Sequence, residues 1–359
     1  MKNIISTKNS NPMKKKLLIS LLSFVYYLTI YAQTVYVDSN IGNDNNTGTE
    51  KAPLFSINKA AEIINRKDND IYIMKINPGI YVLDKHILVA TEKAMTDKHI
   101  VIEASVLPDD STWTPEKMPI IVNSSKKGEI SGEDYSYVIS FLINESHVTI
   151  RGIKFHGYFY PNTRYFPIAR FNKTKIGLLV EQCMFVGDKD ASHIQVGIIA
   201  HGNEINVDHC VFYNVKNTVV FWEDAGDNIK YGNSLTNSII FGAFQSAVWT
   251  AWPDKVFIFK NNIVSDCKHV WVKNSFNTTK YLVDNCVIVN NQYYKGVPND
   301  AGVSLGKFEI NEKNITKEGT ISLRLIDNID KPFPIDYLHI IPNSLGYSIG
   351  AGLFKHKKQ

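Results

Sequence analysis

Six segments of this chain repeat one eight-residue pattern at a nearly constant interval. They lie at 148–155, 178–185, 205–212, 233–240, 257–264 and 281–288, so successive copies start 30, 27, 28, 24 and 24 residues apart. Within each copy, apolar residues alternate with polar ones. Because one copy cannot bury its apolar side chains alone, a period of this length predicts a solenoid in which the copies stack.

The aligned copies predict two short strands that meet at a sharp bend. Apolar residues alternate, slip by one position and alternate again, as expected for two strands on either side of a bend. Glycine and asparagine tolerate the left-handed backbone that such a bend needs, and stacked asparagine amides can hydrogen-bond along the axis. The bend residues are Gly152, Gln182, His209, Asn237, Asn261 and Asn285.

A third apolar stretch lies between successive copies, at 196–202, 218–224, 246–252 and 269–274. Three strands per rung, a rung being one turn of the coil, predict an all-β fold, a single-domain right-handed parallel β-helix. An antiparallel sandwich would need hairpin turns such as Asn-Gly between its strands, and these are largely missing from the sequence.

The N-terminal part of the chain is expected to contain a signal peptide and a cap. A basic stretch and the apolar run 17–32, which ends at Ala32, predict a signal peptide over residues 1–32. An uncleaved anchor is the alternative, although the run is short for a membrane-spanning helix. An amphipathic helix within 54–66 would cap the open core. We therefore assign 33–75 to an N-terminal cap region and 76–359 to the β-helix domain with its closing segment.

The net charge and the predicted export limit the kinds of partner that the mature chain can have. Residues 1–32 hold five lysines and no acidic residue, so their removal lowers the formal net charge from +4 to −1. A chain with so little positive charge is not expected to bind nucleic acid. We expect an exported bacterial protein, periplasmic or extracellular, that is a monomer and has no stable membrane insertion after cleavage.

The four cysteines of an exported chain could form disulfides. Three of them share one repeat position with small or apolar residues, which favours an inward ladder of free thiols, because a buried free cysteine behaves as a small hydrophobe. Cys267 lies in a predicted turn with no evident partner. The column consists of Ile153, Cys183, Cys210, Ser238, Asn262 and Cys286.

Three further segments carry a family resemblance. Residues 36–64, 76–83 and 336–352 resemble the opening, the proline-glycine first rung and the closing segment of secreted proteins of the bacterial pectate-lyase-like β-helix superfamily. Leu345, Gly346 and Tyr347 depart from the usual closing pattern. With the repeats, the resemblance covers nearly all of 35–352. The superfamily includes pectate lyases, polygalacturonases, other polysaccharide hydrolases, epimerases and phage tailspikes, so it implies the fold and leaves the reaction open.

The resemblance implies that a glycan would lie on the outer face of the third strand of each rung. Strict alternation predicts that Phe221, Trp249 and Trp271 point outward in one column, where aromatic rings with Trp252 could pack on the apolar faces of sugars. The alternative is that the rings fill space under a loop, but exposed aromatic stripes are costly unless used. A one-residue slip in register would instead turn Trp222 outward and Glu223 inward.

The second predicted outward column carries the candidate catalytic groups. Glu223 is the expected acid or nucleophile of a glycoside hydrolase, since desolvation among aromatic rings would raise its pKa. Such an enzyme needs a second carboxyl group, about 5–5.5 Å away for retention or ~6.5–9.5 Å for inversion. Asp224 could supply it, as could Asp188 or Asp190 of the turn 187–193. His201 lies one rung away in the same column.

Two other functions remain open. A polysaccharide lyase needs a base and a cation for the uronate carboxylate, and Lys273, Arg170 and His201 could supply them. A non-catalytic glycan-binding β-helix would need only the aromatic column, and Glu223 and Lys273 would then be solvated surface charges.

No cofactor is required by this interpretation. The oxygen-rich segment 38–50 could bind Ca²⁺, but it lacks the full calcium-loop pattern, and a glycine- and asparagine-rich turn is the alternative. The mixed charges of one further outward column predict a solvated ion ladder. Its members are Arg151, Glu181, Asp208, Lys260 and Asp284.

Overall fold

The computed structural model divides into two compact units, Met1–Gln33 and Thr34–Gln359. The residues described are 33–66, 71–91, 99–125, 130–131, 136–160, 163–222, 232–250, 256–273, 280–297, 308–326 and 330–356, and all of these except Gln33 belong to the second unit. The predicted signal peptide lies outside them. Among the described residues, no helix has the length and apolar character needed to cross a membrane.

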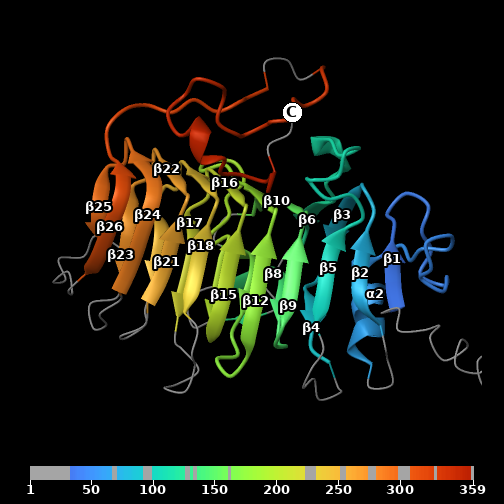
Figure 1. Cartoon of the computed structure of the whole chain (residues 1–359). Coiled ribbons are helices and arrows are strands. Elements are labelled where there is room, and N and C mark those ends of the chain that lie inside the picture. The colour runs from blue at the N-terminus through green and yellow to red at the C-terminus, as the bar shows by residue number, and fades with distance from the viewer. Residues whose placement is uncertain are drawn as a thin grey trace, which may run out of the picture. The chain divides into compact units, whose positions relative to one another are not determined.

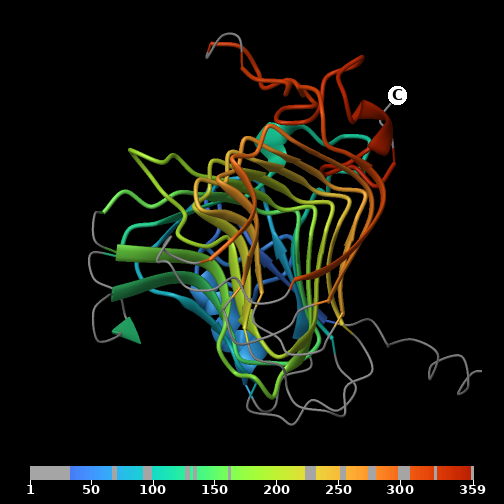
Figure 2. The same cartoon turned by 90° about the vertical axis from the view of Figure 1, so that its left-hand side faces the viewer.

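The second unit is a parallel β-helix, as predicted. Its strands stack along one axis (Figure 1), and a view along that axis shows the rungs superposed (Figure 2). Before the repeats lie β1 (Gln33–Val37), α2 (Ile57–Asn65), β2 (Ile71–Ile76), β3 (Ile80–Leu83), β4 (Ile87–Val89), β5 (Ile100–Ala104), a short 3-10 helix (Pro115–Lys117), β6 (Ile120–Asn123), β7 (Ile130–Ser131) and β8 (Ser136–Ile143).

Each repeat contributes strands to two sheets, here called sheet 1 and sheet 2. Sheet 1 holds both strands of every bend, and in the repeats these are β9 (Val148–Arg151), β10 (Lys154–His156), β12 (Ile176–Glu181), β13 (Met184–Val186), β15 (Asn203–Asp208), β16 (Val211–Tyr213), β18 (Asn233–Thr236), β19 (Ile239–Phe241), β21 (Val256–Lys260), β22 (Ile263–Ser265), β24 (Lys280–Val289) and β26 (Glu309–Thr316). Sheet 2 holds the third strands, which are β11 (Thr163–Arg170), β14 (Ile198–His201), β17 (Asn217–Trp222), β20 (Ser246–Thr250), β23 (His269–Lys273) and β25 (Tyr293–Gly296), together with β4, β7 and β8.

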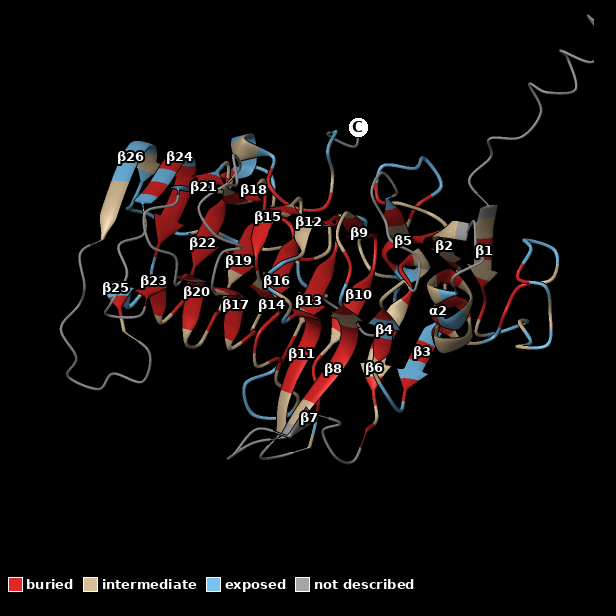
Figure 3. Cartoon of the chain, turned by 90° about the horizontal axis from the view of Figure 1, so that it is seen from below, coloured by how far each residue is buried: buried red, intermediate tan, exposed pale blue. Residues whose placement is uncertain are grey.

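The strand pairing of sheet 1 confirms the predicted inward columns. Val148 pairs with Leu178 and Leu178 with Ile205, all in parallel register. In another column, the rings of Phe155 and Phe185 stack with centroids 5.1 Å apart, and Phe185 stacks on the next ring at 4.6 Å. All of these side chains are buried in one continuous core. Figure 3 shows this as buried strands running the length of the coil.

The predicted bend is also present. All six bend residues have positive φ, between 50° and 74°. Asn261 Nδ2 donates to Asn237 Oδ1 at 2.8 Å, and Asn285 Nδ2 donates to Asn261 Oδ1 at 2.8 Å. The amide ladder therefore adds side-chain hydrogen bonds along the axis to backbone bonds that already run through the bend, such as that from the Asn261 amide to the Asp284 carbonyl at 3.0 Å.

The predicted ion ladder exists, but it is less solvated than expected. Arg151 Nε donates to Glu103 Oε2 at 2.7 Å, and its Nη1 lies 3.3 Å from Glu181 Oε1. Glu181 is 6% exposed because the closing segment covers it, and its Oε2 lies 2.6 Å from Lys355 Nζ. Burial strengthens these pairs relative to surface ion pairs.

Helix α2 covers the N-terminal end of the core, as predicted, whereas the closing segment packs along the side of the coil. Helix α2 begins after Ser56, whose hydroxyl accepts from the Lys59 amide, and it buries Ile57, Ala60 and Ile64 on the core. The closing segment 330–356, which includes a 3-10 helix (Tyr347–Ile349), runs back along the outer face of the second strands of sheet 1, drawn in red in Figures 1 and 2. Outward residues of those strands form a second apolar cluster with it, whose buried members include Met184, Val211, Ile239, Ile263, Leu338, Ile340 and Leu353.

We predict that the amide ladder stabilises the fold measurably. Asn261→Ala removes two amide hydrogen bonds and puts alanine, which tolerates the left-handed conformation less well than asparagine, at φ of 55°, so it should lower the free energy of unfolding by about 2–4 kcal/mol. Asn261→Gly loses the same hydrogen bonds without that strain and should lose less. Denaturant unfolding checks both values. Wild-type stability in the alanine variant would contradict the role of the ladder.

We predict that all four thiols are unreactive in the folded protein. The cysteines are free and buried, as predicted for the column, and burial raises the pKa of the Cys183, Cys267 and Cys286 thiols to about 12. The reactive thiolate is therefore scarce at mildly alkaline pH. Titration with Ellman's reagent should find no fast thiol before unfolding and four after it, without reductant. A deficit after unfolding would indicate a disulfide.

Candidate functional site

The register of sheet 2 differs by one residue from the predicted alignment. Ala200 pairs with Phe221, Phe221 with Thr250 and Thr250 with Lys273, and the shared column faces the core. The expected outward placement of Phe221, Trp271 and Lys273 is therefore wrong. Strands such as 218–222 are apolar on both faces, so alternation alone could not tell the inside from the outside.

Inside the coil, these large side chains pack against other aromatic rings. Phe221 is fully buried, with its ring centroid 6.0 Å from that of Phe257. Trp271 is also fully buried and lies 4.9 Å from Phe259 and 4.7 Å from Tyr281. Burying a ring of this size stabilises the fold by about 1.5–3 kcal/mol. In β23 the observed register turns Trp271 inward, whereas in β17 it turns Phe221 inward and leaves the larger Trp222 outside, so ring size alone does not set the register.

Two other tryptophans face outward on sheet 2. Trp249 pairs with Val220, on the face opposite the core. Of the three aromatic residues predicted to point outward in this column, Trp249 is the one that does. Trp222 lies beside it, with ring centroids 5.1 Å apart and planes inclined by 55°, and both rings are half-buried. His201 pairs with Trp222 in the next strand. The outer face therefore carries an aromatic pair next to a histidine. The predicted residues Glu223, Asp224 and Trp252 lie outside the described residues.

Arg170 is not on the outer face, which corrects its predicted role in substrate binding. Its side chain is fully buried, Nε donates to the His201 carbonyl at 2.9 Å, and Nη2 donates to the Asn203 carbonyl at 3.1 Å. Burial lowers the pKa of the guanidinium to about 10, although the Glu204 carboxylate opposes the shift. Arg170 thus holds, from inside, the junction between the end of β14 at His201 and the start of β15 at Asn203.

Lys273 and the turn 187–193 also lie apart from the outer aromatic pair. Lys273 is 1% exposed, and its Nζ lies 4.9 Å from the centroid of the Phe308 ring. Burial lowers the pKa of its ammonium group. Asp188 accepts from the backbone amides of Asp190 and Ala191 within its own turn. That turn precedes β14, whereas His201 and Trp222 end their strands, so the topology does not bring Asp188 or Asp190 toward Trp222.

The structure brings together three residues that sequence reasoning missed. His99, His147 and Glu204 line a cavity of about 370 Å³ on the outer face of the first strands of sheet 1. His147 and Glu204 both have φ of 56°, at the repeat position where Gly177 has φ of 67°. Backbone strain in a non-glycine residue beside a cavity is a pointer to function. The sequence signal for this site was that histidine and glutamate stand at His147 and Glu204, at a repeat position where another copy has glycine, Gly177.

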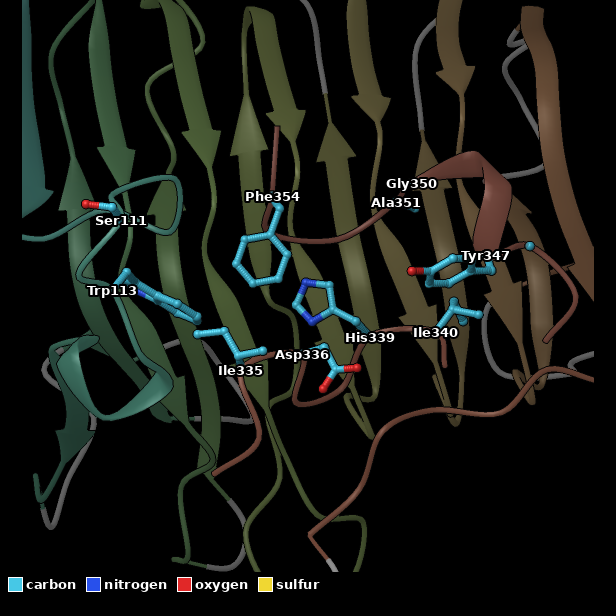
Figure 4. Close-up of a pocket in the computed structure, with 11 residues that line it drawn as sticks. Ser111, Trp113, Ile335, Asp336, His339, Ile340, Tyr347, Gly350, Ala351 and Phe354 are labelled. Atoms are coloured by element: carbon cyan, nitrogen blue, oxygen red, sulfur yellow. The ribbon is translucent and has the colours of Figure 1, made fainter. Parts of the chain in front are cut away.

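A larger cavity, of about 490 Å³, lies under the closing segment (Figure 4). Its walls are Trp113, from the segment before β6, and residues of 335–354. Sequence reasoning did not predict it, because the two walls are more than 200 residues apart in the chain.

In the predicted calcium segment, the carboxylates of Asp38 and Asp44 accept hydrogen bonds from backbone amides. Asp38 Oδ1 accepts from the amides of Asn40 and Ile41, and Asp44 Oδ1 accepts from those of Phe55 and Ser56. Within the part of the chain that the structure describes, no group of three or more His, Cys, Asp or Glu residues could hold a metal ion.

Comparisons with known proteins find similarity only at the level of the coil. No family model and no curated protein matches the sequence. A GH136 lacto-N-biosidase from Eubacterium ramulus is 11% identical, with a TM-score of 0.43 over 85% of this chain and 70% of that one. A rhamnogalacturonan lyase is 12% identical, with a TM-score of 0.37 over 89% and 99%. XylC in complex with xylose is 9% identical, with a TM-score of 0.41 over 79% and 68%. Likenesses this weak assign neither a family nor an activity.

We predict that Arg170 acts through the geometry of its guanidinium fork. Arg170→Met leaves the His201 and Asn203 carbonyls without their donors and should lower the free energy of unfolding by about 2–4 kcal/mol. Arg170→Lys should not restore it, because one ammonium group does not reproduce the two directed donors. Denaturant unfolding measures both variants. A fully stable lysine variant would show that charge alone suffices.

Proposed function

We propose that this chain is an exported carbohydrate-active enzyme, specifically a glycoside hydrolase, that binds a glycan on the outer face of sheet 2. The observation that carries the proposal is the half-buried pair of Trp222 and Trp249 beside His201. The C–H faces of sugar rings pack on indole rings, and the hydroxyl groups at the ring edge need polar partners such as imidazole. A glycan running parallel to the coil axis would cross both tryptophans.

The proposed catalytic acid is Glu223, which follows Trp222 directly in the sequence. Trp222 is the last residue of β17 that the structure describes, so the alternation observed in that strand does not assign a side to Glu223, and the proposal places its carboxyl group beside the outward rings. An aromatic surrounding raises the pKa of a carboxyl group and suits it to protonate the glycosidic oxygen. The second carboxylate would be Asp224, or Glu204 near the start of β15, three residues after His201, acting as the nucleophile or as the base that activates water. Asp188 and Asp190 are poorer candidates, because their turn precedes β14.

The geometry favours hydrolysis over the lyase reaction. A lyase needs a cation next to the uronate carboxylate, and two of the three predicted groups, Arg170 and Lys273, lie inside the coil. Of that set, His201 alone lies on the outer face. A glycan-binding protein without catalysis is the second candidate, since Trp222 and Trp249 would suffice for it. We further propose that the mature chain is a monomer in the periplasm or outside the cell.

A screen of the mature chain against polysaccharides, with mass analysis of the products, tests this function. Glu223→Gln should lower kcat by about 10²–10⁴-fold, because it removes the proton donor. Glu62→Gln, on the exposed face of α2, is the matched control. Trp249→Ala should weaken glycan binding by about tenfold. Asp224→Asn and Glu204→Gln identify the second carboxylate.

Three results would count against the proposal. Cleavage by Glu223→Gln at the wild-type rate would remove the assigned acid. An unsaturated uronide product would identify a lyase instead. Glycan binding that depends on Trp249, with no cleavage of any substrate, would identify a binding protein.

A further inference from the structure

The cavity under the closing segment has one wall made of three aromatic rings (Figure 4). Trp113 and Phe354 meet edge to face, with centroids 5.5 Å apart and planes at 83°. Phe354 in turn stacks on His339 at 4.7 Å and 21°. Trp113 is 2% exposed, and Ile335 and Tyr347, each 43% exposed, form part of the rim. The cavity is thus apolar on one side and open on the other.

His339 contributes a fixed, neutral ring to this wall. The Leu353 amide can only donate, so Nε2 of His339 accepts from it at 2.9 Å. The proton is therefore on Nδ1, which donates to the Tyr337 carbonyl at 2.9 Å. With both ring nitrogens engaged by the backbone and the ring stacked on Phe354, His339 is held in place in the wall and carries no charge.

The polar groups of the cavity suit a neutral ligand with hydroxyl groups. Asp336 lines the cavity, and its Oδ2 lies 3.3 Å from Arg324 Nε, so the carboxylate is paired while it retains acceptor capacity. Figure 4 shows the Tyr347 hydroxyl directed toward the His339 ring. A carboxylate at the rim also disfavours an anionic ligand, because like charges repel.

The cavity is built before any ligand arrives. Lys355 Nζ binds Glu181, Gln182 Nε2 donates to the Leu353 carbonyl at 2.8 Å, and the Gly352 amide donates to the Asn237 carbonyl at 2.9 Å. These bonds tie the closing segment to the bends of sheet 1. A ligand would therefore meet a largely preformed site and would lose little affinity to ordering the chain.

We propose that this cavity is an accessory sugar-binding site that takes one neutral pyranose unit, separate from the outer face of sheet 2. Its volume of about 490 Å³ lies in the range of small-molecule sites. The C–H groups of a pyranose would pack against Phe354, the one of the three rings that is partly exposed, with Trp113 and His339 supporting it from behind, and its hydroxyl groups would bond Asp336 and Tyr347. The choice of a sugar as the ligand class rests on the proposed function.

Calorimetric titration of the full mature chain with methyl glycosides of neutral hexoses, a deoxyhexose and a pentose tests the site. At least one neutral glycoside should bind, and Tyr347→Ala should weaken that binding at least tenfold. Tyr293→Ala is the matched control, because Tyr293 on β25 is 47% exposed. Ile335→Ala should also weaken binding, whereas Ile258→Ala should not, since Ile258 has the same 43% exposure elsewhere. The matching hexuronate should bind at least tenfold more weakly than the neutral sugar.

The outcomes separate this site from the proposed hydrolase. Binding that is lost in Tyr347→Ala and kept in Glu223→Gln supports the accessory site, whether or not the wild type cleaves a glycan. Absence of binding by every neutral glycoside, or binding unchanged in both Tyr347→Ala and Ile335→Ala, would overturn it. Thermal unfolding of each variant verifies that the folded chain is measured. Cleavage is assayed in parallel, so a failure of the hydrolase proposal is seen independently.

Discussion

Each rung of this chain can bury its apolar side chains only against the rungs before and after it. That constraint requires the same kind of side chain at the same position in every copy, as the stack of Phe155, Phe185 and Phe212 shows. It also requires the bend to repeat, which the asparagine amides achieve by bonding along the axis. Only the outer faces and the connecting turns are free to differ between rungs, so a binding or catalytic site has to lie there.

The interior nevertheless shapes the outer surface. Arg170 occupies an inward position but reaches the carbonyls of His201 and Asn203, which fixes the turn between sheet 2 and sheet 1. A buried guanidinium is costly unless it is hydrogen-bonded, so this turn is held more firmly than a surface loop. His201, which faces outward next to Trp222, therefore has a rigid support.

The closing segment has two physical roles. It covers the apolar outer residues of the second strands, such as Met184 and Val211, which would otherwise be exposed along the length of the coil. Because it lies on those strands as a chain of irregular shape, it does not fill all the space beside Trp113, and a cavity with aromatic walls remains. Covering an apolar face and building a ligand site are thus results of the same contact.

The sequence alone determined the parallel coil, the inward columns of sheet 1, the left-handed bends and the free cysteines, because these follow from a periodic pattern read within each repeat. It did not determine which face of sheet 2 carries Phe221 and Trp271, since both faces of those strands are apolar and packing against the neighbouring rungs decided the register. Nor did it predict the cavity between Trp113 and Phe354. That cavity depends on where the chain end returns along the coil, and a local period contains no information about contacts over such a separation.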